Sequence, residues 1–256
     1  MNRPTRYLLG FAAVSLAVYA GLCAMLYSKQ RQLLYYPQPM AAGGEAATFR
    51  LRARGPRVLV SARELAVPDA IVYYGGNAED VSQLLPKFAA AFPKHALYLL
   101  HYRGYGGSQG TPSEAALYAD ARTLFDFAHK RHARVIVVGR SLGSGLAVRV
   151  ASARPAAKLV LITPYDSMVG VAAEHYPLFP VSLILQDRYE SYLYAPKVRA
   201  PTRIIVAGAD EVIPRASTEQ LLRSFAPGIA SEVVVAGATH GNIPEDPRYL
   251  GWFIAP

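Results

Sequence analysis

Six short apolar runs, separated by helical stretches, constrain the fold of this chain more than any other feature. The runs are nearly continuous in apolar residues, which is typical of strands covered on both faces, as in a parallel sheet. They lie at 70–74, 96–100, 135–138, 159–162, 204–207 and 232–236. Helices are expected between them at 81–92, 112–132, 142–153 and 217–225. This alternation predicts an α/β fold, with a mostly parallel central sheet and helices on both faces.

Three local features refine this fold. Apolar residues alternate with arginines at 49–54 and a Gly-Pro turn follows, which predicts an antiparallel edge hairpin before the first parallel strand. Thr111 is predicted as the N-cap of the helix that begins at Pro112, with Glu114 as its capping-box partner. About forty residues rich in Tyr and Pro precede the strand that starts near Thr202, and long loops in compact domains are usually functional. We therefore predict a cap inserted at about 164–198.

The N-terminus carries an uncharged apolar segment. Residues 7–27 read YLLGFAAVSLAVYAGLCAMLY, and as a helix they would span about 30 Å, the thickness of the hydrocarbon core of a bilayer. Tyr7 and Tyr27 stand at its ends, as interfacial aromatic residues do. A cleaved signal peptide has a shorter apolar region and a small-residue cleavage site. We therefore predict a tail at 1–6, an uncleaved transmembrane helix at 7–27, a linker at 28–47 and a globular domain at 48–256.

The charge balance indicates an anionic neighbour. Lys and Arg number 27 against 18 Asp and Glu, which gives a net charge of +9. With a membrane helix present, lipid head groups are the expected partner. The sequence has no basic stripe interleaved with aromatic residues, so a nucleic-acid partner is not expected. The α-amino group, Arg3 and Arg6 exceed Lys29 and Arg31 by about one charge. That bias favours an N-terminus inside the cell, and a globular domain outside the cytoplasm on a plasma or inner membrane.

A serine stands at a sharp turn between a predicted strand and a predicted helix. The sequence Gly139-Arg-Ser141-Leu-Gly143 follows the run at 135–138, and Gly-x-Ser-x-Gly in that context is a nucleophile elbow. The serine backbone is strained there, and side chains at 139 and 143 would collide with the neighbouring strand and helix. Ser141 is therefore the candidate nucleophile.

A serine hydroxyl needs a base and an orienting acid, which in this architecture follow later strands in the order acid, then histidine. Asp210 follows the run at 204–207, and His240 follows the run at 232–236. Glu211 and Asp166 are the competing acids. The sequence thus predicts a Ser141, Asp210 and His240 triad.

An acyl-transfer site also needs two N–H groups for the oxyanion. The Leu142 amide opens the helix after Ser141, and the loop Gly75-Gly76-Asn77-Ala78 after the first parallel strand can supply the second donor. We favour Asn77, with Ala78 as the alternative. His129 and His132 could in principle share a metal ion, but without an acidic partner they are interpreted as part of an exposed helix face.

Several motifs together resemble the α/β-hydrolase superfamily. More narrowly, they are similar to the membrane-anchored serine hydrolases that include mammalian depalmitoylases, lysophospholipases and their bacterial and yeast relatives. The motifs are Leu-Leu-Tyr-Tyr-Pro (33–37), Gly-Asn-Ala (76–78), His-Tyr-Arg-Gly-Tyr-Gly-Gly-Ser (101–108), Gly-Thr-Pro-Ser-Glu (110–114), Gly-Arg-Ser-Leu-Gly (139–143), Ala-Pro (200–201) and Thr-His-Gly-Asn (239–242). The resemblance covers most of residues 33–245 and implies a Ser-Asp-His triad that hydrolyses an ester, thioester or lipid acyl bond, with no cofactor or metal expected.

Two other functions remain open at this stage. One is a hydrolase-fold membrane protein that only binds a partner or a lipid. The other is a peptidase on the same fold, which would need an acidic anchor for the substrate amine. The candidates for that anchor in the cap are Glu174, Asp187 and Glu190.

Overall fold

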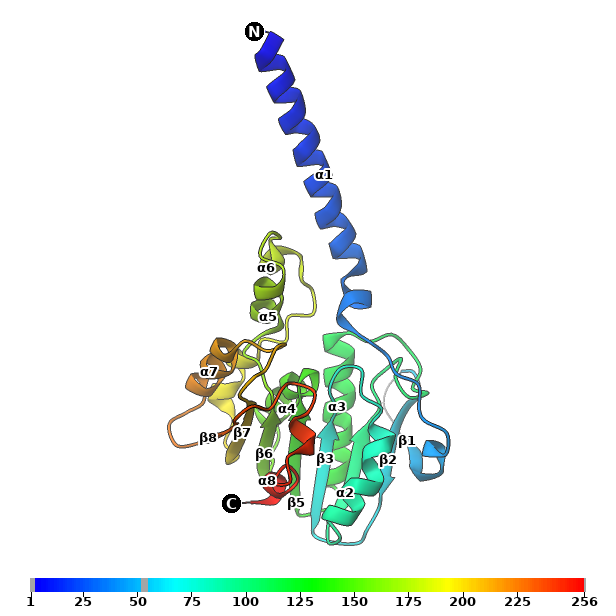
Figure 1. Ribbon diagram of the computed structural model, residues 1–256. Helices are drawn as coiled ribbons and strands as arrows, with labels where there is room; N and C mark the ends of the chain where they lie inside the picture. The colour runs from blue at the N-terminus through cyan, green and yellow to red at the C-terminus, as the bar shows by residue number, and fades with distance from the viewer. Residues whose placement is uncertain (1–2, 52–54, 256) are drawn as a thin grey trace.

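The centre of the molecule is an eight-stranded sheet, seen in the computed structural model, which describes residues 3–51 and 55–255 (Figure 1). The strands lie in the order β1-β2-β4-β3-β5-β6-β7-β8. Their bounds are β1 (Thr48–Leu51), β2 (Val58–Arg63), β3 (Asp69–Tyr74), β4 (Ala96–Leu100), β5 (Arg134–Arg140), β6 (Lys158–Ile162), β7 (Thr202–Ala207) and β8 (Ala230–Val235). Strands β3 to β8 are parallel, and β1 and β2 are antiparallel. The predicted mostly parallel sheet is confirmed; residues 52–54 of the predicted hairpin lie outside the described residues.

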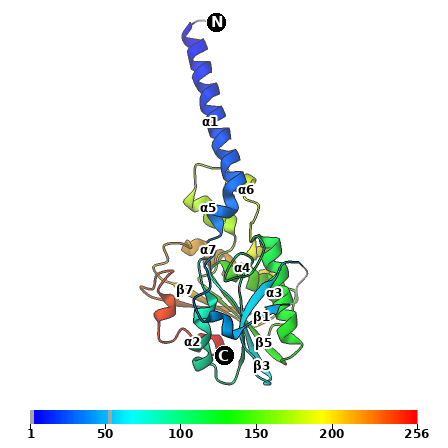
Figure 2. The same ribbon diagram turned by 90° about the vertical axis from the view of Figure 1, so that its right-hand side faces the viewer.

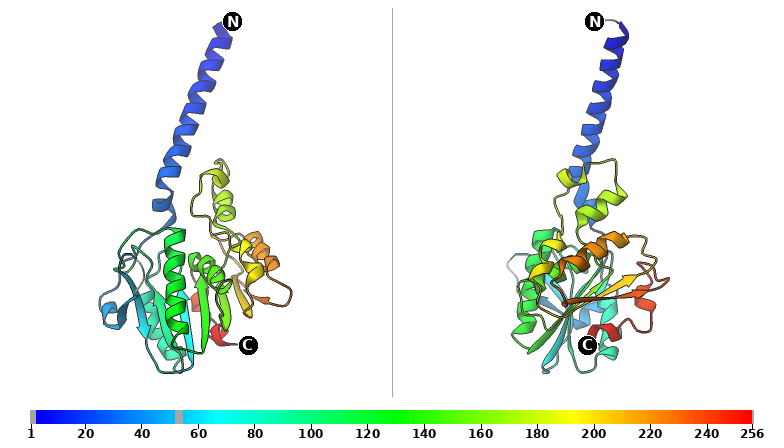
Figure 3. Two further views of the ribbon diagram at one scale, coloured as in Figure 1. Left: turned by 180° about the vertical axis from the view of Figure 1, so that it is seen from behind. Right: turned by 90° about the vertical axis from the view of Figure 1, so that its left-hand side faces the viewer.

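Helices cover both faces of the sheet (Figure 3). One face carries α3 (Glu114–His129), α4 (Leu142–Ala151) and α7 (Arg215–Ser224), and the other carries α2 (Leu85–Ala91) and α8 (Gly251–Ile254). Alternate residues of a strand point to opposite faces. In β3, Val72 and Tyr74 therefore join the first apolar layer, while Ile71 and Tyr73 join the second. Burial on both faces explains why these strands are continuous apolar runs.

The start of α3 differs from the prediction. Ser113, not Thr111, is the N-cap: its side chain accepts a hydrogen bond from the Ala116 N–H, and its backbone is extended. Glu114 makes no capping box, because its carboxylate accepts hydrogen bonds from the backbone N–H groups of Arg188 and Tyr189 in the cap. The motif at 110–114 therefore joins α3 to the cap.

The N-terminal helix is longer than the predicted membrane segment. Helix α1 (Arg3–Leu34) begins before residue 7 and includes 28–34, which were predicted to belong to the linker. The first proline after the apolar segment is Pro37, so nothing in 28–34 interrupts the helix. Residues 4–34 are long and apolar enough to cross a membrane, with a mean hydropathy of 2.0 and none of the apolar window buried.

The cap connects β6 to β7 and lies beside the end of α1 (Figure 2). It contains α5 (Met168–His175) and α6 (Val181–Ile184), followed by two short 3-10 turns at Ser191–Leu193 and Ala195–Lys197. Other 3-10 turns lie outside the cap, at Gly44–Ala47, Val81–Leu84 and Ile243–Glu245. Cap and α1 leave the sheet at the same end of the molecule (Figure 1).

A buried histidine makes the stability of this fold depend on pH. His101 follows β4, is 2% exposed, and its Nε2 lies 2.8 Å from the Ser61 hydroxyl on β2. Burial lowers the pKa of His101 to about 4. Since an unfolded histidine titrates near pH 6.5, the unfolded chain binds more protons between the two values.

We predict that acidification from about pH 6.5 to pH 4 lowers the free energy of unfolding by up to about 3 kcal/mol through His101. The His101→Gln variant, which keeps a polar partner for Ser61, should lose this component. Urea unfolding of the full chain in a neutral detergent, measured at several pH values, gives the comparison. Identical pH slopes for the two proteins in this window would show that His101 is not responsible.

Candidate active site

Ser141 lies at the turn between β5 and α4 in a strained backbone conformation. Its φ is +47° and its ψ is −116°, values that residues other than glycine rarely adopt. The turn forms because two glycines allow close approach: a Cβ at Gly143 would lie 2.1 Å from the Tyr74 carbonyl oxygen, and one at Gly139 would lie 2.5 Å from the Gly143 oxygen. Both positions therefore require glycine, because any side chain there would collide with the neighbouring backbone, as the sequence analysis expected.

The structure brings Ser141, His240 and Asp210 together from three different loops. Ser141 follows β5, Asp210 follows β7 and His240 follows β8. His240 Nε2 lies 2.9 Å from Ser141 Oγ, and His240 Nδ1 lies 3.0 Å from each oxygen of the Asp210 carboxylate. One imidazole thus contacts a hydroxyl and a carboxylate through its two nitrogens, the arrangement that base-assisted attack by a serine requires.

The surroundings of Asp210 keep its carboxylate ionised. Burial alone would raise its pKa, but the hydrogen bond with His240 and those from the Ile213 and Val212 N–H groups, at 2.8 and 2.9 Å, hold the pKa of Asp210 below its usual range. A charged acceptor of this kind fixes the orientation of the imidazole.

The two competing acids bind elsewhere. Glu211 accepts a hydrogen bond from the backbone N–H of His240 at 3.1 Å, not from its ring. Asp166 accepts hydrogen bonds from the hydroxyl groups of Ser217 and Ser167. Of these three acids, all within the described ranges, Asp210 is the one whose carboxylate contacts the imidazole.

The helix start and the loop that carry the candidate oxyanion donors both lie near Ser141. Leu142 is the first residue of α4, and Gly76 lies so close to Ser141 that a Cβ at 76 would be 3.7 Å from the Ser141 Cβ. The Gly76 N–H donates to Glu79. In residues 3–51 and 55–255, no acceptor binds the backbone N–H of Leu142, Asn77 or Ala78. The choice between Asn77 and Ala78 as the second donor stays open.

The side chain of Asn77 has a role that the sequence analysis missed. Its Nδ2 donates to the carbonyl of Leu34, the last residue of α1, at 2.6 Å. Its Oδ1 accepts hydrogen bonds from the Tyr36 N–H at 3.0 Å and from the Tyr105 hydroxyl at 2.7 Å. Asn77 therefore joins the loop after β3 to the end of α1 and to the loop at 101–108. The sequence carried no signal for this contact, because it joins segments that meet only in the folded chain.

A buried ion pair, also missed, connects the loops around Ser141. Arg140 Nη1 lies 2.8 Å from Glu79 Oε1, and both side chains are less than 15% exposed. The second Glu79 oxygen accepts the Gly76 N–H at 2.6 Å, and Arg140 Nη2 donates to the His240 carbonyl at 3.3 Å. A charged residue inside the buried Gly-Arg-Ser-Leu-Gly turn was the available sequence signal, because a buried charge requires a partner.

His129 and His132 do not form one exposed face as expected. His129 is exposed and stacks on Phe125, whereas His132 is buried beyond the end of α3, between the Tyr98 hydroxyl and the Val67 carbonyl. Among the residues that the structure describes, no group of three or more His, Cys, Asp or Glu side chains could hold a metal ion.

Comparison with known proteins identifies relatives across most of the chain, although no family model matches it. An uncharacterized protein of Mycobacterium tuberculosis is 33% identical over 254 residues, covering 91% of this chain and 88% of the relative. An alpha/beta hydrolase domain-containing protein of Caenorhabditis elegans is 30% identical and covers 70% of this chain and 54% of that protein. Protein bem46 of Schizosaccharomyces pombe is 25% identical over 78% of this chain and 76% of its own length.

Solved structures show the same fold at low sequence identity. MGS-M2, an alpha/beta hydrolase enzyme from a deep-sea metagenome library, aligns with a TM-score of 0.65 and 14% identity, covering 80% of this chain and 96% of that one. Est1E of Butyrivibrio proteoclasticus, with ferulic acid bound, aligns with a TM-score of 0.60 and 13% identity, covering 75% and 90%. The chain therefore has the α/β-hydrolase fold and belongs to the family of the Mycobacterium tuberculosis relative.

Proposed function

We propose that this protein is a membrane-anchored serine hydrolase that cleaves an ester, thioester or lipid acyl bond. The observation that carries the proposal is the relay of contacts from Asp210 through His240 to Ser141 Oγ, at 3.0 and 2.9 Å. The candidate oxyanion N–H groups near Ser141 support the same reaction class. The strained backbone of Ser141 supports it too, since strain of this kind concentrates at functional sites.

The proposed reaction proceeds through an acyl-enzyme. His240 Nε2 accepts the proton of Ser141 as Oγ attacks the substrate carbonyl carbon, while the N–H groups of Leu142 and of Asn77 or Ala78 donate to the oxyanion. His240 then gives the proton to the leaving alcohol or thiol, whose bond to the carbonyl carbon breaks. Water, deprotonated by His240, attacks the acyl-Ser141 ester and releases the acid.

Two of the three acidic side chains in the cap that could anchor a substrate amine are already paired with arginines. A peptidase needs a free carboxylate for the substrate amine, but Asp187 binds Arg31 at 2.9 Å and Glu190 binds Arg188 at 3.1 Å. Glu174 is exposed on α5. Est1E, a structural neighbour, carries ferulic acid, and the sequence motifs resemble depalmitoylases and lysophospholipases. An acyl bond of a lipid or lipidated molecule is accordingly the substrate class that we infer.

Membrane anchoring is the second part of the proposal. Helix α1 has the length and hydropathy to span a bilayer, and its apolar segment is exposed along its length. The charge bias at its two ends supports an N-terminus inside the cell and a catalytic domain outside the cytoplasm.

We predict that Ser141→Ala abolishes labelling by a fluorophosphonate probe and lowers hydrolysis of p-nitrophenyl esters by a factor on the order of 10⁶. The neighbouring variant Ser144→Ala, which removes a hydroxyl that donates to the Ser141 carbonyl, should remain labelled. Labelling of Ser141→Ala at the wild-type rate would exclude Ser141 as the nucleophile. A wild-type protein that is never labelled would favour a non-catalytic binding role.

We predict that Asp210→Asn lowers turnover by about 10⁴-fold, because the amide stabilises the wrong imidazole tautomer. The matched control is Asp166→Asn, whose side chain bonds to Ser217 and Ser167 and should retain turnover within a few-fold. The measurement is the kcat of both variants on one soluble ester, and it shows whether Asp210 or Asp166 is the acid that orients His240. A large loss in Asp166→Asn with none in Asp210→Asn would reverse the assignment.

We predict that Glu79→Gln weakens the site by loosening the loops that Glu79 joins. Breaking a buried ion pair costs about 3–5 kcal/mol of stability, because the partner charge is left uncompensated. The melting temperature and the labelling rate should fall together, with kcat affected more than KM. Glu219→Gln removes an exposed pair with Arg215 on α7 and should cost less than about 1 kcal/mol. Equal behaviour of the two variants would contradict a positioning role for Glu79.

A further inference from the structure

The cap runs alongside α1 over several helical turns. Nearest the N-terminus, the Tyr19 hydroxyl donates to the Leu178 carbonyl at 2.9 Å, and the rings of Tyr19 and Phe179 stack with centroids 6.1 Å apart. Nearer the domain, the side chain of Gln30 bonds to the backbone of Ile184 and Gln186.

The ladder of contacts ends with Arg31, which pairs with Asp187. Residues 176–187 of the cap therefore lie beside residues 19–31 of α1.

The cap segment and α1 change from apolar to polar sequence at positions that lie beside each other. The cap reads YPLFPVSLIL at 176–185, without a charge, and becomes polar at Gln186, Asp187 and Arg188. Helix α1 becomes polar at Lys29, Gln30 and Arg31, and Gln30 and Arg31 contact this part of the cap. The coincidence marks one boundary shared by both elements.

Large apolar side chains on the cap tip are exposed. Leu178 is 81% exposed, Leu183 is 82% exposed and Tyr176 is 53% exposed. Apolar surface on this scale, gathered on one projecting segment, is typical of a contact with a protein or a membrane. The neighbouring α1 is exposed and apolar in the same region, which favours the membrane.

The length of α1 supports the same choice. If the bilayer began above the cap, only residues 7–18 would remain to cross it, and at 1.5 Å per residue they span about 18 Å of the roughly 30 Å required. If the bilayer begins at Tyr27, Tyr19 lies about 12 Å below the bilayer surface, because eight residues of α1 separate the two tyrosines. The cap tip that touches Tyr19 then lies at the same depth.

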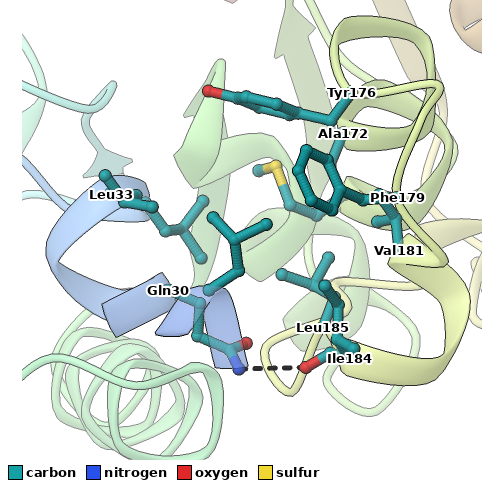
Figure 4. A pocket seen from close by; sticks show the side chains of 11 residues that line it. Gln30, Leu33, Ala172, Tyr176, Phe179, Val181, Ile184 and Leu185 are labelled. Carbon is teal, nitrogen blue, oxygen red and sulfur yellow. Dashed lines mark hydrogen bonds between the residues drawn. The ribbon is translucent and has the colours of Figure 1, made fainter. Parts of the chain in front are cut away.

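An apolar pocket lies between the two elements (Figure 4). It has a volume of about 110 Å³ and is lined on one side by α1 and on the other by the cap. Figure 4 shows Leu33 of α1 facing Ala172, Phe179 and Val181 of the cap, with Gln30 bonded to Ile184 at one margin. Leu26 lines the pocket on the apolar side of the shared boundary, and Leu33 and Leu34 line it on the domain side, so the pocket crosses the boundary.

We propose that residues 176–185 are immersed in the bilayer beside α1, and that the pocket between them takes the acyl chain of a membrane lipid. The inference rests on the membrane anchoring in the proposed function and adds a second lipid-contacting segment. It also gives a route by which the cap receives an acyl chain without passing through water.

The immersion can be measured with a fluorophore at position 178. In the full chain carrying Cys23→Ala, Leu178→Cys is labelled with an environment-sensitive dye and reconstituted in phosphatidylcholine–phosphatidylglycerol vesicles. The matched site is Val234→Cys on β8, an exposed apolar residue far from the cap in sequence. We expect lipids spin-labelled on the acyl chain to remove most of the emission at 178, and aqueous iodide to quench only the dye at 234.

Two results would overturn the proposal. One is a dye at 178 that iodide quenches as readily as the dye at 234. The other is a dye shielded from iodide but untouched by the lipid spin labels, which would indicate a protein partner. Co-flotation of the wild-type chain with vesicles is scored separately. Its failure would overturn both the anchoring and the immersion, whereas missing fluorophosphonate labelling would overturn only the hydrolase proposal.

Activity gives an independent readout of the surface and the pocket. The double variant Leu178→Glu, Leu183→Glu should hydrolyse a long-chain ester in vesicles about a hundredfold more slowly, since burial of each leucine accounts for about tenfold. Its hydrolysis of soluble p-nitrophenyl acetate should be unchanged, as should both activities of Val234→Glu. Ala172→Leu, which fills the pocket, should shift the preference toward shorter acyl chains. An equal loss on both substrates, or an unaltered chain-length preference, would contradict the proposal.

Discussion

The close approach of α4 to the end of β3 is the constraint on which the site depends. A Cβ at Gly143 would lie 2.1 Å from the Tyr74 carbonyl oxygen, so the helix can begin at that point only with glycine. The same approach places the first amide of α4 beside the loop that follows β3. It also forces Ser141 into its strained conformation, which is retained because the helix and the sheet are packed on both sides of it.

The buried pair Glu79–Arg140 extends this constraint to the other loops. One loop follows β3, a turn follows β5 and another loop follows β8, and the hydrogen bond between His240 and Ser141 joins the last two. Glu79 holds the Gly76 amide and Arg140 holds the His240 carbonyl, so the spacing of the loops is set by one carboxylate and one guanidinium. A charge pair is suited to this task because both partners must stay together once they are removed from water.

The sequence predicted correctly those features in which the backbone conformation, or the order of elements along the chain, requires a particular residue type. The apolar runs predicted the parallel sheet, and the two glycines around Ser141 predicted the turn for the reason that the structure bears out. Contacts between distant segments could not be read in this way. The Asn77 side chain, the Glu79–Arg140 pair and the burial of His132 depend on which loops meet in space. Helix α1 continues to Leu34 because helical propensity persists after the apolar segment stops, and apolar character alone does not mark the end of a helix.

The position of α1 relates the membrane to the site. Parallel α/β sheets bind ligands beyond the carboxyl ends of their strands, and the loops that carry Ser141, Asp210 and His240 leave the sheet there. Helix α1 ends at that same edge, where the Leu34 carbonyl bonds to Asn77, and the cap rises from the carboxyl end of β6 (Figure 1). A bilayer crossed by α1 would therefore face the catalytic edge of the sheet. The hydrogen bond at Asn77 then has two effects, since it binds the last carbonyl of α1 and fixes the loop whose amide would stabilise the oxyanion.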